Sequence, residues 1–173
     1  LWQGPTEAQL ATLEQYEMRV ICSQNAVGLA HKNDSLIMGW MHGDEPDNLQ
    51  WNEATQSYGP AIPPSTIIAD YNTIVQNDTS RPVVLNLGQK VANDEFLGSV
   101  ATAADYREYV KGADIVSFDV YPVVGINKTN GENYLYYVGR GVDRLRDYTN
   151  DEKPVWNFVE CTHISNPDKK ATP

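Results

Sequence analysis

The sequence predicts an α/β fold in which about five parallel strands alternate with helices. Three observations indicate it: short apolar runs rich in β-branched residues recur along the chain, helical patterns separate them, and no glycine-rich phosphate-binding fingerprint follows an early strand. The βα order is typical of an eight-stranded barrel or a doubly wound open sheet, and the missing fingerprint favours the barrel. About five strands do not close such a barrel. We therefore expect a single domain over residues 1–173 that forms a partial or truncated (β/α) TIM-type barrel.

The expected strands are the apolar runs themselves. Each is short enough for a buried parallel strand and is followed by polar or turn-forming residues. In order along the chain, they are residues 18–24, 36–42, 82–88, 114–120 and 154–160.

The expected helices lie between these strands. Thr6 and Gln9 have the spacing of a capping box and predict the start of the first helix, and a short helical stretch is expected over residues 25–33. Ser65 is the expected N-cap of the next helix. A further helix over residues 102–111 precedes a glycine suited to a left-handed cap, and the last carries apolar residues at helical spacing from 135 to 145.

A long loop over residues 43–64 separates the second strand from the following helix. Its four prolines exclude a regular helix, and it carries the aromatics Trp51 and Tyr58. Long loops after strands of βα units are usually functional, so we expect this one to contribute to a site.

The charge of the chain restricts its partners. A net charge of -10 and a sequence pI of about 4.6 argue against nucleic acid or an anionic membrane, since both repel an acidic surface. A neutral, polyhydroxylated ligand meets no such repulsion. No apolar run approaches the roughly 20 residues of a membrane helix. Cys22 and Cys161 each lie in an apolar stretch and are expected to be buried free thiols.

Polar residues cluster where the expected strands end. In parallel βα folds the carboxyl ends of the strands meet at one rim, where working residues gather. Two glutamates follow directly on apolar strands, Glu45 and Glu160. Glycosidic cleavage needs one protonated and one ionised carboxyl group, so this pair predicts a glycosidase; the alternative is that either glutamate forms a strand-end salt bridge.

The residues around these glutamates resemble a known family. Asp44-Glu45-Pro46 and Trp156-Asn157-Phe158-Val159-Glu160 resemble the ends of the fourth and seventh strands of clan A glycoside hydrolases, which are (β/α)8 barrels. The resemblance implies that the present strands are the third to the seventh of eight. It also implies that Glu45 is the general acid/base, that Glu160 is the nucleophile of a retaining mechanism without a cofactor, and that Tyr121 matches an aromatic that hydrogen-bonds the nucleophile.

One position departs from the clan pattern. Asp44 stands where the clan usually has an asparagine whose amide binds the sugar 2-hydroxyl. An aspartate accepts a hydrogen bond but donates none, and its charge is expected to raise the pKa of the neighbouring glutamate. An altered sugar preference or a loss of activity would follow.

Several further residues could bind sugar hydroxyls or stack on sugar rings. Trp51 and Tyr58 present faces suited to a pyranose, although a tryptophan within a strand, such as Trp40, more often belongs to the core. The polar candidates could equally satisfy nearby backbone groups. The expected substrate-binding residues are Asp44, His42, Asn86, Gln89, Asp119, Tyr121, Trp156, Asn157 and His163.

Two other hypotheses for the function remain open. His42, Asp44 and His163 could converge as ligands of a metal-dependent hydrolase, although none has the spacing of a known zinc motif, and the leading hypothesis needs no metal. The chain could also be a non-catalytic carbohydrate-binding or scaffold fragment of a barrel, whose open sheet edges would favour self-association. Polysaccharide-degrading relatives are often exported, which weakly favours a secreted or periplasmic location.

Overall fold

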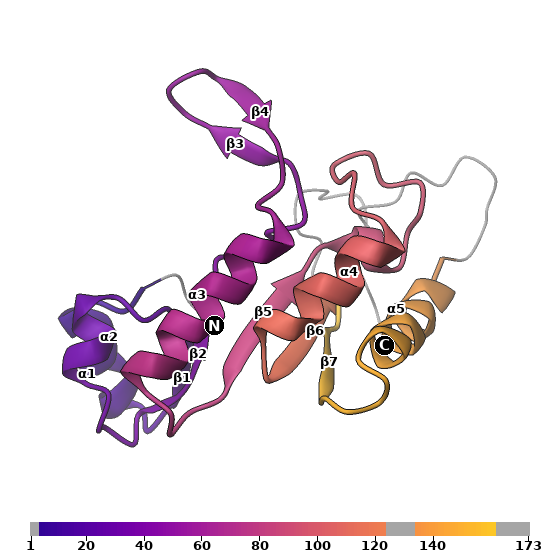
Figure 1. The fold of residues 1–173 in the computed structure, drawn as a ribbon. Coiled ribbons are helices and arrows are strands. Elements are labelled where there is room, and N and C mark those ends of the chain that lie inside the picture. Colours follow the sequence, from indigo (N-terminus) through magenta and orange to yellow (C-terminus); the bar gives the residue numbers. More distant parts are fainter. Residues whose placement is uncertain (1–3, 124–133, 162–173) are drawn as a thin grey trace.

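The computed structural model describes residues 4–123 and 134–161, which form an α/β fold around a five-stranded parallel sheet (Figure 1). The order of the strands in the sheet follows their order in the chain, and every neighbouring pair is parallel. The α/β prediction with five parallel strands is therefore confirmed, without the reversal of strand order that marks a doubly wound sheet. From one edge to the other, the strands are β1 (Val20–Cys22), β2 (Ile37–Met41), β5 (Val83–Leu87), β6 (Ile115–Asp119) and β7 (Val155–Phe158).

An α-helix precedes β1, and a further α-helix lies in each of the four connections between successive strands of the sheet. In order, the helices are α1 (Glu7–Gln15), α2 (Ala26–Ala30), α3 (Pro64–Asn77), α4 (Ala103–Tyr109) and α5 (Tyr136–Tyr148), with short 3-10 turns η1 (Gln89–Val91) and η2 (Val110–Gly112).

Two helix starts were predicted from capping residues, with different outcomes. The capping box of Thr6 and Gln9 is formed at the start of α1, as expected. Ser65 is not an N-cap: α3 begins one residue earlier, with Pro63 at the cap and Pro64 at the first helical position. Proline is well suited there, because its fixed φ is helical and the N–H that it lacks would have no helical partner.

The main core lies between one face of the sheet and the helices. Leu85 and Leu87 of β5 and Val116 and Phe118 of β6 are fully buried in a cluster to which α3, α4 and α5 contribute. Gly141 of α5 allows this close packing, because a Cβ there would overlap the Phe118 ring. The alternation along a strand directs every second side chain to the other face of the sheet, which therefore carries Asn86, Ser117 and Asp119.

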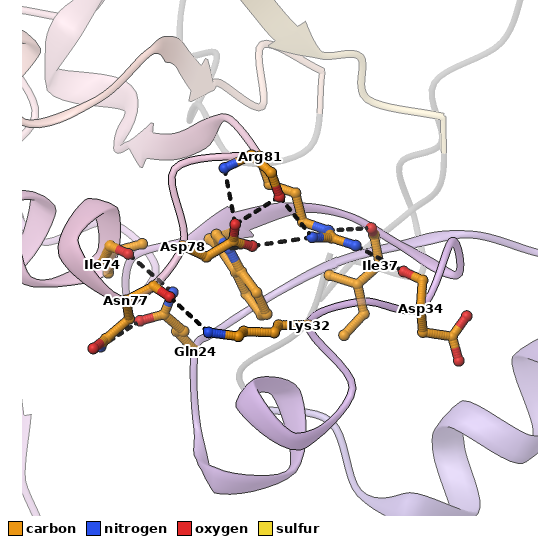
Figure 2. Close-up of polar contacts among 10 residues, drawn as sticks. Gln24, Lys32, Asp34, Ile37, Ile74, Asn77, Asp78 and Arg81 are labelled. Atoms are coloured by element: carbon orange, nitrogen blue, oxygen red, sulfur yellow. Dashed lines mark hydrogen bonds and ion pairs between the residues drawn. The ribbon is translucent and has the colours of Figure 1, made fainter.

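A polar network joins the end of α3 to the start of the sheet (Figure 2). Arg81 donates to the Asp78 carboxylate at 3.0 Å and to the backbone oxygen of Ile37 at 2.6 Å. The indole of Trp40 donates to the same carboxylate at 3.0 Å. Because β2 begins at Ile37 and β5 at Val83, this network lies at the edge of the sheet opposite the carboxyl ends of the strands.

The long loop after β2 contains a two-stranded antiparallel hairpin that projects beyond the sheet (Figure 1). The hairpin consists of β3 (Gln50–Asn52) and β4 (Ser57–Gly59). It was not expected, since strands of three residues are too short to show a clear alternating pattern.

The two cysteines are both free, but only one is buried. Cys22 of β1 lies in the core, and burial raises the pKa of its thiol to about 11. Cys161 is exposed after the end of β7, so the expectation of burial was wrong for this residue. Of the helices in the described ranges, none has the length and apolar character needed to span a bilayer.

Candidate functional site

The carboxyl ends of β2, β5 and β6 bring together the central group of the expected site residues. Asn86, the fourth residue of β5, donates from its amide to Asp44 at 2.9 Å and to Asp119 at 3.3 Å. Its orientation is fixed from the other side by Ser117, whose hydroxyl donates to the Asn86 amide oxygen at 2.9 Å. The Asn86 amide thus links two carboxylates, that of Asp44 after β2 and that of Asp119 at the end of β6. These two strands lie on either side of β5 in the sheet.

Asp119 ends β6 and is only 7% exposed. Its Oδ2 atom accepts hydrogen bonds from Asn86 and, at 3.1 Å, from the hydroxyl of Tyr121. Its Oδ1 atom is buried and has no hydrogen-bond donor among the described residues. The Glu45 carboxyl lies within hydrogen-bonding reach of Asp119. A proton on Glu45 would supply the donor that Asp119 lacks.

Glu45 is held by a turn that follows β2. Its φ of 43° lies in the left-handed region, which non-glycine residues adopt rarely and which is often found at functional sites. The turn is fixed on both sides, because Glu45 N–H donates to the Asn86 carbonyl and Asn48 N–H donates to the Glu45 carbonyl, both at 3.1 Å. The Asn48 amide also donates to Glu45 Oε2 at 2.8 Å. The carboxyl group is thus fixed by the protein itself.

Asn48 is in turn packed against Gly88. A Cβ at Gly88 would come within 2.5 Å of the Asn48 amide oxygen, so only glycine leaves room for this side chain. The φ of Gly88 is -78°, which any residue adopts, so the constraint is one of space alone. Gly88 thereby supports the position of Glu45 through Asn48.

The environment of Glu45 holds its carboxyl group in the protonated form. Burial is the largest cause, followed by the hydrogen bond and charge of Asp119 and by the charges of Asp44 and Asp47, and together they raise the pKa of Glu45 to about 9. The expected effect of Asp44 is present, but it is smaller than those of burial and Asp119. Within residues 4–123 and 134–161, no salt bridge engages Glu45, Asp44 or Asp119.

Asp47, two residues after Glu45, anchors the loop. It is fully buried, and its two carboxylate oxygens accept from Gly88 N–H and from the Tyr106 hydroxyl, both at 2.8 Å. Burial raises the pKa of Asp47, while these hydrogen bonds oppose the rise. With both oxygens engaged, Asp47 serves the structure of the loop that carries Glu45.

Glu160 follows β7 at the same edge of the sheet. It is half-buried, and its Oε2 atom accepts a hydrogen bond from the backbone N–H of Val123 at 2.8 Å. Val123 lies two residues after Tyr121, so Glu160 is tied to the segment that follows β6. The hydroxyl of Tyr121 itself donates to Asp119. Trp156 of β7 is 39% exposed.

The structure does not bring every expected residue into this group. His42 is buried, and its Nε2 lies 2.7 Å from the backbone oxygen of Gly112, the last residue of η2, shortly before β6. Burial lowers the pKa of His42, so its ring is neutral and serves packing between strand and helix layer. The Asn157 amide donates to the Phe118 carbonyl at 3.2 Å, and the amide oxygen of Gln89 is buried without a donor in the described ranges.

No metal site is formed by the described residues: no group of three or more His, Cys, Asp or Glu side chains is arranged to hold an ion. His42, expected as one ligand, is engaged with Gly112. His163, expected as another, lies outside the described residues.

Two residues of the site were missed from the sequence. Ser117 lies two positions before Asp119 in the same strand, so the alternation of the strand could have placed it on the rim face. Asn48 lies in the polar run that follows the second expected strand, but its contact with Glu45 depends on the conformation of the turn and could not be predicted.

The comparisons with known proteins address the fold. The chain resembles part of a β-D-glucuronidase. The matched structure is the β-D-glucuronidase of Dictyoglomus thermophilum, with a TM-score of 0.54 and 12% sequence identity. The match covers 92% of this chain, which spans 29% of the glucuronidase chain. At this identity the likeness shows the fold alone. No protein-family model and no curated protein matches the sequence.

Proposed function

We propose that this chain carries the acid/base centre of a glycoside hydrolase that cleaves O-glycosidic bonds of oligo- or polysaccharides by a retaining, two-glutamate mechanism. The observation that carries the proposal is Glu45, a carboxyl group at a strand tip whose pKa is raised to about 9. Such a group is protonated at neutral pH and can donate to a leaving oxygen. The fold likeness to part of a glucuronidase supports the choice of reaction class.

In the proposed first step, Glu45 transfers its proton to the glycosidic oxygen while a Glu160 carboxylate oxygen attacks the anomeric carbon. The bond from that carbon to the leaving oxygen breaks, and a glycosyl ester of Glu160 forms. In the second step, Glu45, now ionised, takes a proton from water as the water oxygen attacks the anomeric carbon and releases Glu160. Two inversions at that carbon give net retention.

The neighbouring carboxylates have a role in this scheme. Asp44 and Asp119 raise the pKa of Glu45 and thereby keep the proton available for the first step. Their negative charge also stabilises the positive charge that develops on the sugar ring in an oxocarbenium-like transition state. Asn86 holds the two carboxylates in place in the absence of substrate.

The decisive experiment compares aryl glycosides with good and poor leaving groups. Glu45→Gln is expected to lower kcat/KM for phenyl glycosides by about a hundredfold or more. Dinitrophenyl glycosides, which depart without a proton, should be affected far less in the first step. Glu160→Ala is expected to lose hydrolysis of both. Glu152→Gln, a substitution of an exposed glutamate before β7, is the control and should match wild type.

Geometry provides a second test of the same mechanism. A retaining mechanism requires the carboxyl groups of Glu45 and Glu160 to lie roughly 5–5.5 Å apart, whereas about 6.5–9.5 Å indicates inversion. A crystal structure of the chain with a bound sugar measures this separation. If both variants hydrolyse every glycoside as wild type does, the two glutamates are not catalytic. Binding of sugars without any hydrolysis by wild type would favour the non-catalytic alternative.

A further inference from the structure

A groove extends from Glu45 towards the hairpin that the sequence did not predict. Its volume is about 620 Å³, within the range of small-molecule sites of about 300–1,000 Å³. One side is formed by the loop before the hairpin and the other by residues 96–98, and the two sides are joined by a hydrogen bond from Leu49 N–H to the Gly98 carbonyl at 2.7 Å. The lining includes Asp44, Glu45, Asn48, Trp51, Tyr58 and Leu97.

Two aromatic rings of the hairpin line this groove. Trp51 and Tyr58 are directly paired across β3 and β4, so their side chains lie on the same face of the hairpin. Their ring centroids are 5.1 Å apart in an edge-to-face arrangement. Nevertheless, Trp51 is 46% exposed and Tyr58 is 68% exposed. Two large rings are therefore presented to the groove instead of being buried in a core.

The charges of the lining restrict what the groove can hold. Of its described lining residues, the ionisable carboxyl groups are those of Asp44 and Glu45, Glu45 being held protonated, and no lysine or arginine is among them. An anionic ligand would meet no compensating cation there. Exposed aromatic rings beside polar groups suit a neutral ligand with both apolar C–H faces and hydroxyls, which is the chemistry of a neutral sugar ring.

We propose that this groove is the subsite for the leaving-group sugar of a neutral oligosaccharide, with Trp51 and Tyr58 as its stacking platform. The assignment deepens the proposed function and rests on it for its direction. Glu45 donates its proton to the leaving oxygen, so the part of the substrate beyond that oxygen lies on the Glu45 side. The groove begins at Glu45 and continues away from it to the two rings.

Binding tests the platform without requiring turnover. The probes are the tetrasaccharides of cellulose, xylan, mannan and β-galactan, with an oligogalacturonide of the same length as the anionic comparator. Titration calorimetry of the full chain should detect at least one neutral tetrasaccharide and no oligogalacturonide. Trp51→Ala and Tyr58→Ala should each weaken that binding about tenfold, and Trp51→Phe and Tyr58→Phe should retain most of it. Tyr16→Ala is the matched control, because Tyr16 is 66% exposed and lies after the end of α1.

Kinetics tests the direction of the subsite. Trp51→Ala should lower kcat/KM for the bound oligosaccharide about tenfold and leave that for the corresponding glycosyl fluoride nearly unchanged, since a fluoride leaving group is a single atom and does not occupy the groove. Unaltered affinity in both alanine variants, equal binding of the oligogalacturonide, or failure of wild type to bind any neutral tetrasaccharide would each overturn the subsite. The failure of the proposed catalysis is a separate outcome. If sugar binding depends on Trp51 but wild type hydrolyses nothing, the glycosidase mechanism is rejected and the assignment of a sugar-binding groove is retained.

Discussion

At the scale of single residues, the site depends on how one carboxyl group is kept protonated. Glu45 is half-buried and faces the carboxylates of Asp119, Asp44 and Asp47, which come from β6 and from its own loop, with the Tyr121 hydroxyl also near. Asp119 is the strongest of these neighbours, because it acts both by charge and through the hydrogen bond. Asp119 Oδ1 is buried and has no donor among the described residues, so it could accept a proton held by Glu45.

Replacing Asp119 tests this contact. In Asp119→Asn the negative charge is lost, and the introduced amide can donate to an ionised Glu45. We expect the pKa of Glu45 to fall from about 9 by at least about one unit. Carbon-13 NMR of labelled glutamate carboxyls, assigned by comparison with Glu45→Gln, measures it directly. Asp143→Asn on the exposed side of α5 should leave the resonance unchanged. A Glu45 pKa that is the same in Asp119→Asn and wild type would contradict the pairing.

The sequence allowed several residues of the site to be named, but it did not allow the contacts between them to be predicted. Asn86, Asp119 and Tyr121 could be named because they follow from strand ends, which the apolar runs locate. The contact between Glu45 and Asp119 could not be foreseen, since β2 and β6 are separated by β5 and strands next but one are about 10 Å apart. The side chain of Glu45 is positioned by a turn in which Glu45 has a left-handed φ, and no residue pattern in the sequence predicts that turn.

At the scale of elements, the five strands were located correctly and the hairpin was not. The strands of the sheet are apolar runs rich in β-branched residues, which give a plain sequence signal, and β5 is buried along its whole length. The hairpin is polar, short and surrounded by prolines, and it is defined by the pairing of Trp51 with Tyr58. His42 was also misplaced. Its position after β2 predicted a side chain at the carboxyl ends of the strands, but the alternation of the strand directs it to the helix layer.

The junction between α3 and β5 makes a testable contribution to stability. Burial by itself would raise the pKa of Asp78, but hydrogen bonds from Ser80, Trp40 and Arg81 lower it to about 2. Because the folded pKa is below the unfolded value of about 3.9, the stabilisation is complete above pH 4 and is lost as pH falls towards 2.

Asp78→Asn is therefore expected to cost about 2 kcal/mol of unfolding free energy at pH 7. The difference from wild type should shrink as the pH is lowered from 4 to 2.5. Urea unfolding at a series of pH values measures both quantities. Asp70→Asn, which alters an exposed carboxylate of α3, should leave the unfolding free energy nearly unchanged. A constant difference between Asp78→Asn and wild type at all pH values would assign the loss to packing instead of charge.

At the scale of the whole molecule, the fold is an ordered set of βα units with helices on one face and polar rim residues on the other. In the described ranges, β1 and β7 each pair with a single strand, and self-association through these edges stays a prediction.

The raised pKa of Glu45 should also affect the free energy of unfolding of the whole protein. A carboxyl group with a raised pKa favours the folded state only while it is protonated, so stability should fall as pH rises from about 4.3 towards 9.

Glu45→Gln should remove that loss. The variant is expected to match wild type in thermal stability near pH 4 and to exceed it at pH 8 by about 1 kcal/mol or more, because the amide does not ionise. Differential scanning calorimetry at the two pH values gives the comparison. Equal melting temperatures of Glu45→Gln and wild type at pH 8 would show that Glu45 ionises without cost in the folded protein.

The hairpin has one further consequence. The hairpin lies in the connection between β2 and α3, and its two strands pair only with each other and with no strand of the main sheet. Residues 53–56 at its tip take no part in the hydrogen bonds described for Glu45, so the tip can be lengthened, shortened or exchanged while Glu45 keeps its place. If the groove binds sugars as proposed, exchanging this tip would change which ligands the groove accepts and would leave the five-stranded sheet intact.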